Sequence, residues 1–595
     1  MQRVRKISGV LFFGAMLLGV TLSRSAGITA AGPDYDVDVL VVGAGISGLS
    51  CALEIARNSA AVSVRVVDMN SVFGGHAVMA GGGVCIVGTP MQERKKIQDS
   101  PELAYKDFVT WGEDPDPRWT RYYVNNSRRD IYDWVVPMGV VFDEVQAPYG
   151  NSVPRFHQTR GGGLALVTAI YKQCLGKSNI SYKWNFKVES LVSRNGRVAG
   201  VKGLDSRTGA QQEIKARVVV LATGGFQSNL EIVRESWPKP LRFPERLLIG
   251  AGVNAVGSGH KIAKSAGGVL TRLDHQWNYI TGLPDPLDPT GTRGINAYDE
   301  DSIWVNSQGK RFIKELASAK EGMVALLEQK PATYWAIFDD EGKHKFKVTV
   351  AGWRDFSRIE NLILNNPKLT GTASTIEGLA AAAGLPPAAL AETVRRYNEM
   401  VDAGEDTEFG AFTKKDEERP AKIVTPPFFA VQFFPVTRKS MGGVLVDMNC
   451  RVIDKKRRAI PGLYAVGELT GFGGINGKAG LEGTFLGPSI VTGRIAGRTA
   501  LAQLNKRPHG TIKFPWRAMD STGGLEYRRD CSACHNLESL LAARRNGYWH
   551  FEKVHSQVVE RKYDCAKCHA EMVSSRTHRI DRMAQMQNCI LCHQR

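Results

Sequence analysis

The sequence lacks the features that mark several large classes of protein. Its 595 residues contain no low-complexity tract, and no internal repeat apart from a short cysteine motif near the C-terminus. Hydrophobic residues make up 43% of the chain and charged residues 23%, a balance typical of globular proteins. After residue 32, no apolar run approaches the roughly 20 residues that a membrane-spanning helix needs. These absences exclude a disordered, fibrous or polytopic membrane protein, and the length predicts about three or four domain-sized units.

Acidic residues are in deficit, and cysteine is scarce before the C-terminal region. Lys and Arg number 77 against 59 Asp and Glu, which gives a formal net charge of +18. This excess favours acidic partners or anionic surfaces, although bound anionic cofactors would neutralise part of it, and we expect no nucleic-acid partner. Four cysteines precede residue 530, far apart in sequence: Cys51, Cys85, Cys174 and Cys450. A disulfide among them stays open, because sequence cannot reveal one.

The N-terminus has the pattern of an export signal. Basic residues Arg3, Arg5 and Lys6 precede an apolar run over residues 7–22, and small residues follow up to Ala31. A basic segment, a short apolar segment and a small-residue cleavage site are typical of a secretory signal peptide. The alternative is an uncleaved anchor, for which the apolar run is short. We therefore expect residues 1–31 to be removed and the mature protein to be periplasmic, with no integral membrane span.

The last 65 residues carry three Cys-x-x-Cys-His motifs. The cysteine pairs are Cys531 and Cys534, Cys565 and Cys568, and Cys589 and Cys592, followed at once by His535, His569 and His593. In this motif the two thiols form thioethers with haem and the histidine ligates its iron. The alternative, a zinc ribbon, would use two cysteine pairs and give no reason for the third pair or the histidines. The motifs therefore predict three covalently bound c-type haems.

Further histidines can supply the sixth iron ligands. His550, His555 and His578 lie between the motifs, and methionines in the same region compete with them. Spacing does not show which histidine serves which iron. Residues 511–595 contain few aliphatic side chains, so haem itself should form the core of this small multihaem cytochrome c domain. Together with the signal peptide, the motifs indicate a bacterial periplasm.

A dinucleotide-binding fingerprint follows the signal. An apolar strand begins at Val37 and leads into Gly43-Ala44-Gly45-Ile-Ser-Gly48, then a helical pattern, then a second apolar run that ends at Asp68. The glycines allow a tight turn and close approach to a pyrophosphate at the helix N-terminus, and the acidic residue binds ribose hydroxyls. Because strand, glycines, helix and acid occur together, the signal is strong.

Three later segments favour FAD over a nicotinamide nucleotide. They contain Gly74-Gly75-His76, Thr223-Gly224-Gly225 and Gly467-Glu468. With these residues the chain resembles the superfamily of fumarate reductases and 3-ketosteroid dehydrogenases, and in particular the soluble flavocytochromes c, over about residues 35–505. The resemblance implies an α/β fold: a doubly wound, Rossmann-like FAD-binding domain in two parts, residues 35–274 and 439–505, with an inserted α+β capping domain over residues 275–438.

The resemblance also bears on individual site residues. His76 matches in position the histidine that carries covalent FAD in membrane-bound relatives, and whether it binds FAD covalently here stays open. The fumarate-binding positions are changed: Ala319 replaces the proton-donor arginine, Tyr279 and Lys439 replace two histidines, and Gly480 replaces the second arginine. Fumarate is therefore not the expected substrate.

Other groups could carry the chemistry. Hydride transfer needs a matching proton transfer and a grip on the activating group of the substrate. We expect Tyr279 or Lys439 to act as acid or base, and Arg293 to contact the substrate or relay a proton.

The expected activity is reduction of an activated C=C bond in a small organic substrate, with electrons from a quinol-linked or soluble periplasmic cytochrome passing through the haems to FAD. Two alternatives stay open: a dehydrogenase that runs the same parts in reverse, and an electron-transfer subunit without enzymatic activity.

Overall fold

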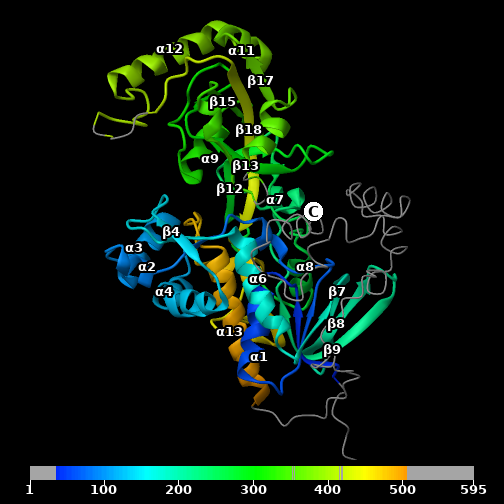
Figure 1. Ribbon diagram of the computed structural model, residues 1–595. Coiled ribbons are helices and arrows are strands. Elements are labelled where there is room, and N and C mark those ends of the chain that lie inside the picture. The colour runs from blue at the N-terminus through cyan, green and yellow to red at the C-terminus, as the bar shows by residue number, and fades with distance from the viewer. Residues whose placement is uncertain (1–34, 351–352, 354, 415, 417–419, 506–595) are drawn as a thin grey trace, which may run out of the picture.

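The computed structural model describes residues 35–350, 353, 355–414, 416 and 420–505. The predicted signal segment and the three Cys-x-x-Cys-His motifs, with every histidine predicted as an iron ligand, lie outside these residues. Figure 1 shows two regions, one above the other, joined by long strands. Among the described residues, none of the helices combines the length and the apolar character that a bilayer crossing requires.

The lower region is built on a mixed sheet whose centre is parallel. Its main path runs β20-β21-β9-β1-β2-β6, and β7 and β8 extend it from β9 as an antiparallel arm. The strands are β1 (Val37–Val42), β2 (Val64–Val67), β6 (Ile180–Lys183), β7 (Phe186–Arg194), β8 (Arg197–Asp205), β9 (Gln211–Leu221), β20 (Arg451–Ile453) and β21 (Ala459–Ala465). All six residues of β1 are buried, as expected for a central parallel strand covered on both faces.

Helices α1 (Ile46–Asn58), α6 (Gly162–Leu175) and α13 (Leu486–Asn505) pack beside this sheet (Figure 1). Glycines let α13 approach α1 closely: a Cβ at Gly493 would lie 2.2 Å from the Ser47 carbonyl oxygen. Across the same contact, Arg494 Nε donates to the buried Glu54 carboxylate at 2.8 Å. The C-terminal end of the described chain is thereby fixed to the first helix of the fold.

The upper region is a second sheet that caps the first. Its main path is β14-β15-β18-β12-β13-β16, with β10 and β17 also paired to β18. The strands are β10 (Leu248–Ile249), β12 (Gln276–Pro284), β13 (Gly294–Asp299), β14 (Ile303–Val305), β15 (Tyr334–Phe338), β16 (Phe346–Val348), β17 (Thr370–Ala373) and β18 (Phe428–Ser440). Stacked rings such as Tyr334 on Phe433, with centroids 5.3 Å apart, hold β15 against β18. The two sheets confirm the expected α/β FAD-binding domain with a capping domain; the multihaem C-terminal domain and the domain boundaries stay predictions.

The remaining elements are short. Two small sheets consist of β3 (Gly83–Cys85), β4 (Phe142–Gln146) and β5 (Phe156–Thr159), and of β11 (Leu270–Thr271) and β19 (Gly443–Val444). The other helices are α2 (Pro90–Arg94), α3 (Pro101–Gly112), α4 (Pro117–Ser127), α5 (Asp133–Val135), α7 (Leu230–Glu235), α8 (Ser258–Ser265), α9 (Ala319–Glu328), α10 (Phe356–Ile359), α11 (Ile376–Ala383) and α12 (Pro387–Ala403). Single turns of 3-10 or π type are η1 (Gly75–Met79), η2 (Arg128–Tyr132), η3 (Val136–Met138), η4 (Gly342–Lys345), η5 (Glu360–Leu364), η6 (Gly467–Leu469) and η7 (Gly471–Gly474). The four cysteines of the described residues are buried free thiols.

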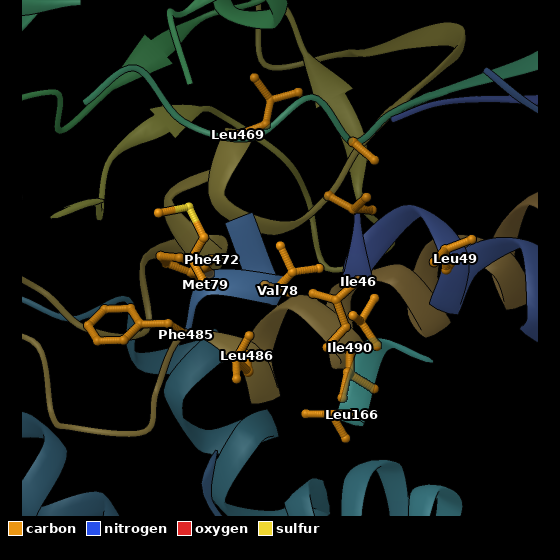
Figure 2. Close-up of a cluster of buried hydrophobic side chains, with 14 of the residues drawn as sticks. Ile46, Leu49, Val78, Met79, Leu166, Leu469, Phe472, Phe485, Leu486 and Ile490 are labelled. Carbon is orange, nitrogen blue, oxygen red and sulfur yellow. The ribbon is translucent and has the colours of Figure 1, made fainter. Parts of the chain in front are cut away.

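An apolar cluster joins α1, η1, α6 and α13. Figure 2 shows its side chains, contributed by segments that are far apart in sequence: Ile46, Leu49, Val78, Met79, Leu166, Leu469, Phe472, Phe485, Leu486 and Ile490. Several of them also line the large cavity between the two regions, among them Ile46, Met79 and Phe485. The packed core therefore forms one wall of the cavity and fixes its shape.

Candidate active site

The fingerprint glycines have distinct structural tasks. Gly43 turns the chain after β1 with φ +114°, which favours a residue without a side chain. A Cβ at Gly48 would lie 2.0 Å from the Gly43 carbonyl oxygen, so only glycine lets α1 pack against that turn. Gly45 precedes α1 and offers no side chain to cap its first N–H groups. These amides face an open space that suits a phosphate group.

Asp68 is held at the end of β2. Its carboxylate accepts hydrogen bonds from the backbone N–H of Ala44 at 2.7 Å and of Asn70 at 2.8 Å. Burial raises the pKa of Asp68 to about 6, and the two N–H groups partly oppose that rise. The side chain lines the cavity, where the fingerprint places the ribose hydroxyls.

A cavity of about 780 Å³ runs from this turn to the capping sheet. Its walls fit FAD in two respects. A Cβ at Gly45 would have no atom nearer than 4.0 Å, and one at Gly224 would meet nothing within 4 Å, so both glycines border free space. Thr223 Oγ1 and His76 Nε2 are buried polar atoms without a partner among the described residues, and both residues line the cavity. A flavin nucleotide would supply the missing contacts.

His76 and Glu468 lie next to each other on the cavity wall. His76 Nδ1 lies 3.9 Å from Glu468 Oε2, while Glu468 Oε1 accepts from the Ser440 N–H at 2.9 Å. Burial lowers the pKa of His76 to about 4, so its imidazole is neutral at pH 7. Burial would raise the pKa of Glu468, but His76, the Ser440 N–H and Lys439 outweigh it and hold that pKa below its usual value.

Strands β12 and β18 build the other end of the cavity. They pair in an antiparallel register that sets Trp277 opposite Lys439 and Tyr279 opposite Val436. This pairing joins two segments about 160 residues apart and brings Tyr279 and Lys439 to one wall. Burial lowers the pKa of Lys439 to about 7, and the neighbouring Arg438 adds to this effect. Lys439 Nζ lies 5.1 Å from the centroid of the Phe485 ring.

Tyr279 donates its hydroxyl hydrogen to a carboxylate that the sequence did not single out. The acceptor is Glu482 Oε1 at 2.8 Å, and Trp277 Nε1 lies 3.4 Å from the same oxygen. Burial, and then the Glu482 charge, raises the pKa of Tyr279 well above its usual value. Glu482 was not among the predicted site residues; the available signal was its place two residues after Gly480, which stands at a substrate-binding position of the resembled family.

Arg293 lies behind the cavity wall, and its role as a substrate contact or proton relay stays a prediction. It does not line the cavity; its Nη2 donates to the Ala251 carbonyl at 2.6 Å, next to the Gly250 carbonyl that accepts from Arg438. Of the predicted FAD residues, Ala44 and Gly48 also lie behind the wall, where they support Asp68 and the glycine turn. The other predicted FAD residues line the cavity: Gly43, Gly45, Asp68, Gly74, Gly75, His76, Thr223, Gly224, Gly225 and Glu468.

Comparison with known proteins agrees with this geometry. Residues 38–486 match the family model described as FAD binding domain. A "Fumarate reductase (cytochrome)" of Shewanella frigidimarina is 33% identical over 485 residues, which cover 80% of this chain and 79% of that protein. A KsdD-like steroid dehydrogenase of Mycobacterium tuberculosis is 30% identical over 567 residues, covering 80% of this chain and 97% of that protein. The open conformation of a flavocytochrome c3 fumarate reductase superposes with a TM-score of 0.65 at 28% identity, covering 80% and 79% of the two chains.

The fold and the cavity thus define a flavoprotein oxidoreductase. The chain belongs to the family of proteins with this FAD binding domain.

Proposed function

We propose that this protein is a periplasmic flavocytochrome c that reduces the activated C=C bond of a small unsaturated acid or a related compound. The observation that carries the proposal is Lys439: a buried amine with a pKa of about 7, on the wall of a flavin-sized cavity. A proton donor is most effective when its pKa lies near the working pH.

The residues of the chain divide the work as follows. FAD, held by the glycine turn and Asp68, would supply the hydride chemistry when bound. Lys439 gives a proton to one carbon of the double bond, and its burial keeps water from competing for that proton. Tyr279 takes no part in this transfer, because its hydroxyl hydrogen is engaged by Glu482.

Fumarate does not suit the substrate end of this cavity. A dicarboxylate needs cationic or hydrogen-bonding groups at both ends, but here the Glu482 carboxylate lines the same wall as Lys439. Arg438 lines it too: its Nη1 donates to the Gly250 carbonyl at 2.7 Å, and its buried Nε, which has no partner among the described residues, offers a cationic contact at one end only. The relatives named as fumarate reductase and steroid dehydrogenase support a wider class of substrates in which a carbonyl or carboxyl group activates the C=C bond.

The electron supply is proposed from the sequence. Three Cys-x-x-Cys-His motifs and an export signal support c-type haems in the periplasm, fed by a quinol-linked or soluble periplasmic cytochrome. A basic chain favours an acidic redox partner. No step of the proton transfer at Lys439 depends on how the electrons arrive.

The test is anaerobic. Purified protein is reduced with dithionite, freed of excess reductant, and mixed with unsaturated acids and enones while the haem and flavin absorbance is followed. The proposal expects rapid reoxidation by at least one conjugated monoacid or enone and much slower reoxidation by fumarate.

A second candidate is the reverse reaction, a dehydrogenase that passes electrons outward. The 30% identity to a KsdD-like steroid dehydrogenase, over 97% of that protein, favours it. In the same assay, bleaching of the oxidised flavin by saturated ketones, with no reoxidation by enones, would establish the dehydrogenase. An electron-transfer subunit would respond to neither set of compounds.

A further inference from the structure

Glu482 is a carboxylate that faces the substrate end of the cavity. The hydrogen bonds from Tyr279 and Trp277 both end on its Oε1 atom. Two donors on one oxygen fix the orientation of the carboxyl group, and they leave the second oxygen, Oε2, for a ligand. A carboxylate can accept hydrogen bonds at both oxygens, so Oε2 can accept one from a ligand.

Of the other polar groups at this cavity, Arg438 is close enough for the Glu482 charge to act on its pKa, but its Nη1 donates to the Gly250 carbonyl. Three uncharged side chains bind one another instead of Glu482. Asn296 donates from Nδ2 to Thr349 Oγ1 at 3.0 Å and accepts from Thr281 Oγ1 at 2.5 Å. These three groups engage one another, and Asn296 and Thr349 line the same cavity as Glu482. The wall therefore presents a fixed acceptor at Glu482.

A cationic side chain and several aromatic rings line the same cavity as Glu482. Lys439 lies on the same wall and is close enough for the Glu482 charge to oppose the fall of its pKa. Rings of Tyr149, Phe156, Tyr298 and Phe485 also line the cavity, and flat apolar surfaces of this kind suit a planar ligand.

We propose that Glu482 binds a hydrogen-bond donor on the substrate, so that the natural substrate is a planar conjugated acid or enone that also carries a hydroxyl, ring N–H or protonated amine. Lys439 keeps its role as proton donor beside the reacting bond, and Glu482 accepts from the donor on the substrate. This inference rests on the proposed function for the identity of the reacting bond, but the binding preference is measurable without turnover.

The experiment uses the oxidised, FAD-loaded full chain and follows the flavin absorbance spectrum as ligands are added. Three probes share one acid and one ring: 4-hydroxycinnamate carries a donor, 4-methoxycinnamate carries an acceptor in its place, and cinnamate carries neither. The comparison separates donor effects from ligand size. Because a hydrogen bond to a charged group stabilises by about 1.5–3 kcal/mol, 4-hydroxycinnamate should bind roughly tenfold or more tightly than the other two.

Glu482→Gln tests the residue itself. The glutamine keeps an acceptor for Tyr279 and Trp277, so the wall should stay in place, while the negative charge is lost. The preference for 4-hydroxycinnamate should fall to about twofold or less. Glu377→Gln is the matched control, since Glu377 is an exposed carboxylate on α11 that does not line the cavity; it should leave the preference unchanged.

The inference is overturned by equal binding of the three probes, by no spectral response to any of them, or by an equal loss of affinity for all three in Glu482→Gln, which would mean a purely structural role. Tighter binding of fumarate than of 4-hydroxycinnamate would also contradict it. Failure of the proposed function has a different signature, namely a donor preference that Glu482→Gln abolishes, with no reoxidation of the reduced protein by any bound acid.

Discussion

A single residue, Lys439, should set the pH dependence of the reaction. Its pKa of about 7 follows from burial and from Arg438, and the ammonium form carries the proton that the reduction consumes. The rate should therefore fall as pH rises through about 7. Lys439→Met should lower kcat by about 10²–10⁴-fold and flatten the pH profile of kcat/KM between pH 5.5 and 9.

A matched variant, Lys202→Met, removes an exposed lysine from β8 and should leave the profile as it is. If the residual activity of Lys439→Met keeps the native pH profile, the proton comes from another group.

The burial of Lys439 also predicts that this residue, which promotes the reaction, lowers the free energy of unfolding at low pH. The pKa of Lys439 is about 7 in the folded chain against an ordinary value of 10.5, so the unfolded chain binds more protons between these values and the free energy of unfolding rises with pH there. Below pH 7 the cost of the buried ammonium is present in full. Apoprotein with Lys439→Met should therefore melt several degrees higher than the native apoprotein at pH 6, and the gap should narrow by pH 9.5. If the difference in melting temperature stays constant with pH, it arises from side-chain packing and not from the charge of Lys439.

The start of α1 offers a test at the scale of an element. Gly45 has φ −74°, which any residue adopts, and a Cβ there would border the cavity, whereas a Cβ at Gly48 would collide with the Gly43 carbonyl. Gly45→Ala should keep the melting temperature of the apoprotein and weaken FAD binding roughly tenfold or more. Gly48→Ala should lower the apoprotein melting temperature by roughly 5 °C. Differential scanning calorimetry measures the melting temperature, and a flavin titration measures the FAD affinity. If both variants change the two quantities equally, the separate roles of Gly45 and Gly48 are wrong.

The same elements show how far the sequence alone could reach. The β1–α1–β2 unit was predictable because its signals are local: an apolar strand, spaced glycines and a helical pattern within about 30 residues. The pairing of β12 with β18 could not be derived from either strand, because it depends on tertiary register. Glu482 was missed for the same reason: a carboxylate acquires a role only when Tyr279 and Trp277 arrive from another part of the chain.

At the scale of the whole molecule, the two described regions enclose the cavity. The C-terminal motifs predict three haems in addition to the FAD. The +18 charge fits a protein that binds anionic cofactors and an acidic partner. FAD accepts two electrons and each haem one, so three haems and one FAD give a capacity of about five electrons per chain.

That capacity is the sharpest whole-molecule prediction, because no other reading of the cysteine motifs gives the same number. Anaerobic titration with dithionite should consume about five electrons per flavin, and a pyridine haemochrome assay should find three haems per flavin. Replacing Cys531 and Cys534 together by serine removes one pair of thioether bonds, so covalent haem should fall by one third and the capacity by one electron, with the flavin content unchanged because the FAD cavity lies within residues 42–489. If the native protein instead contains zinc at these motifs and takes up two electrons, the cytochrome assignment fails while the flavoenzyme remains.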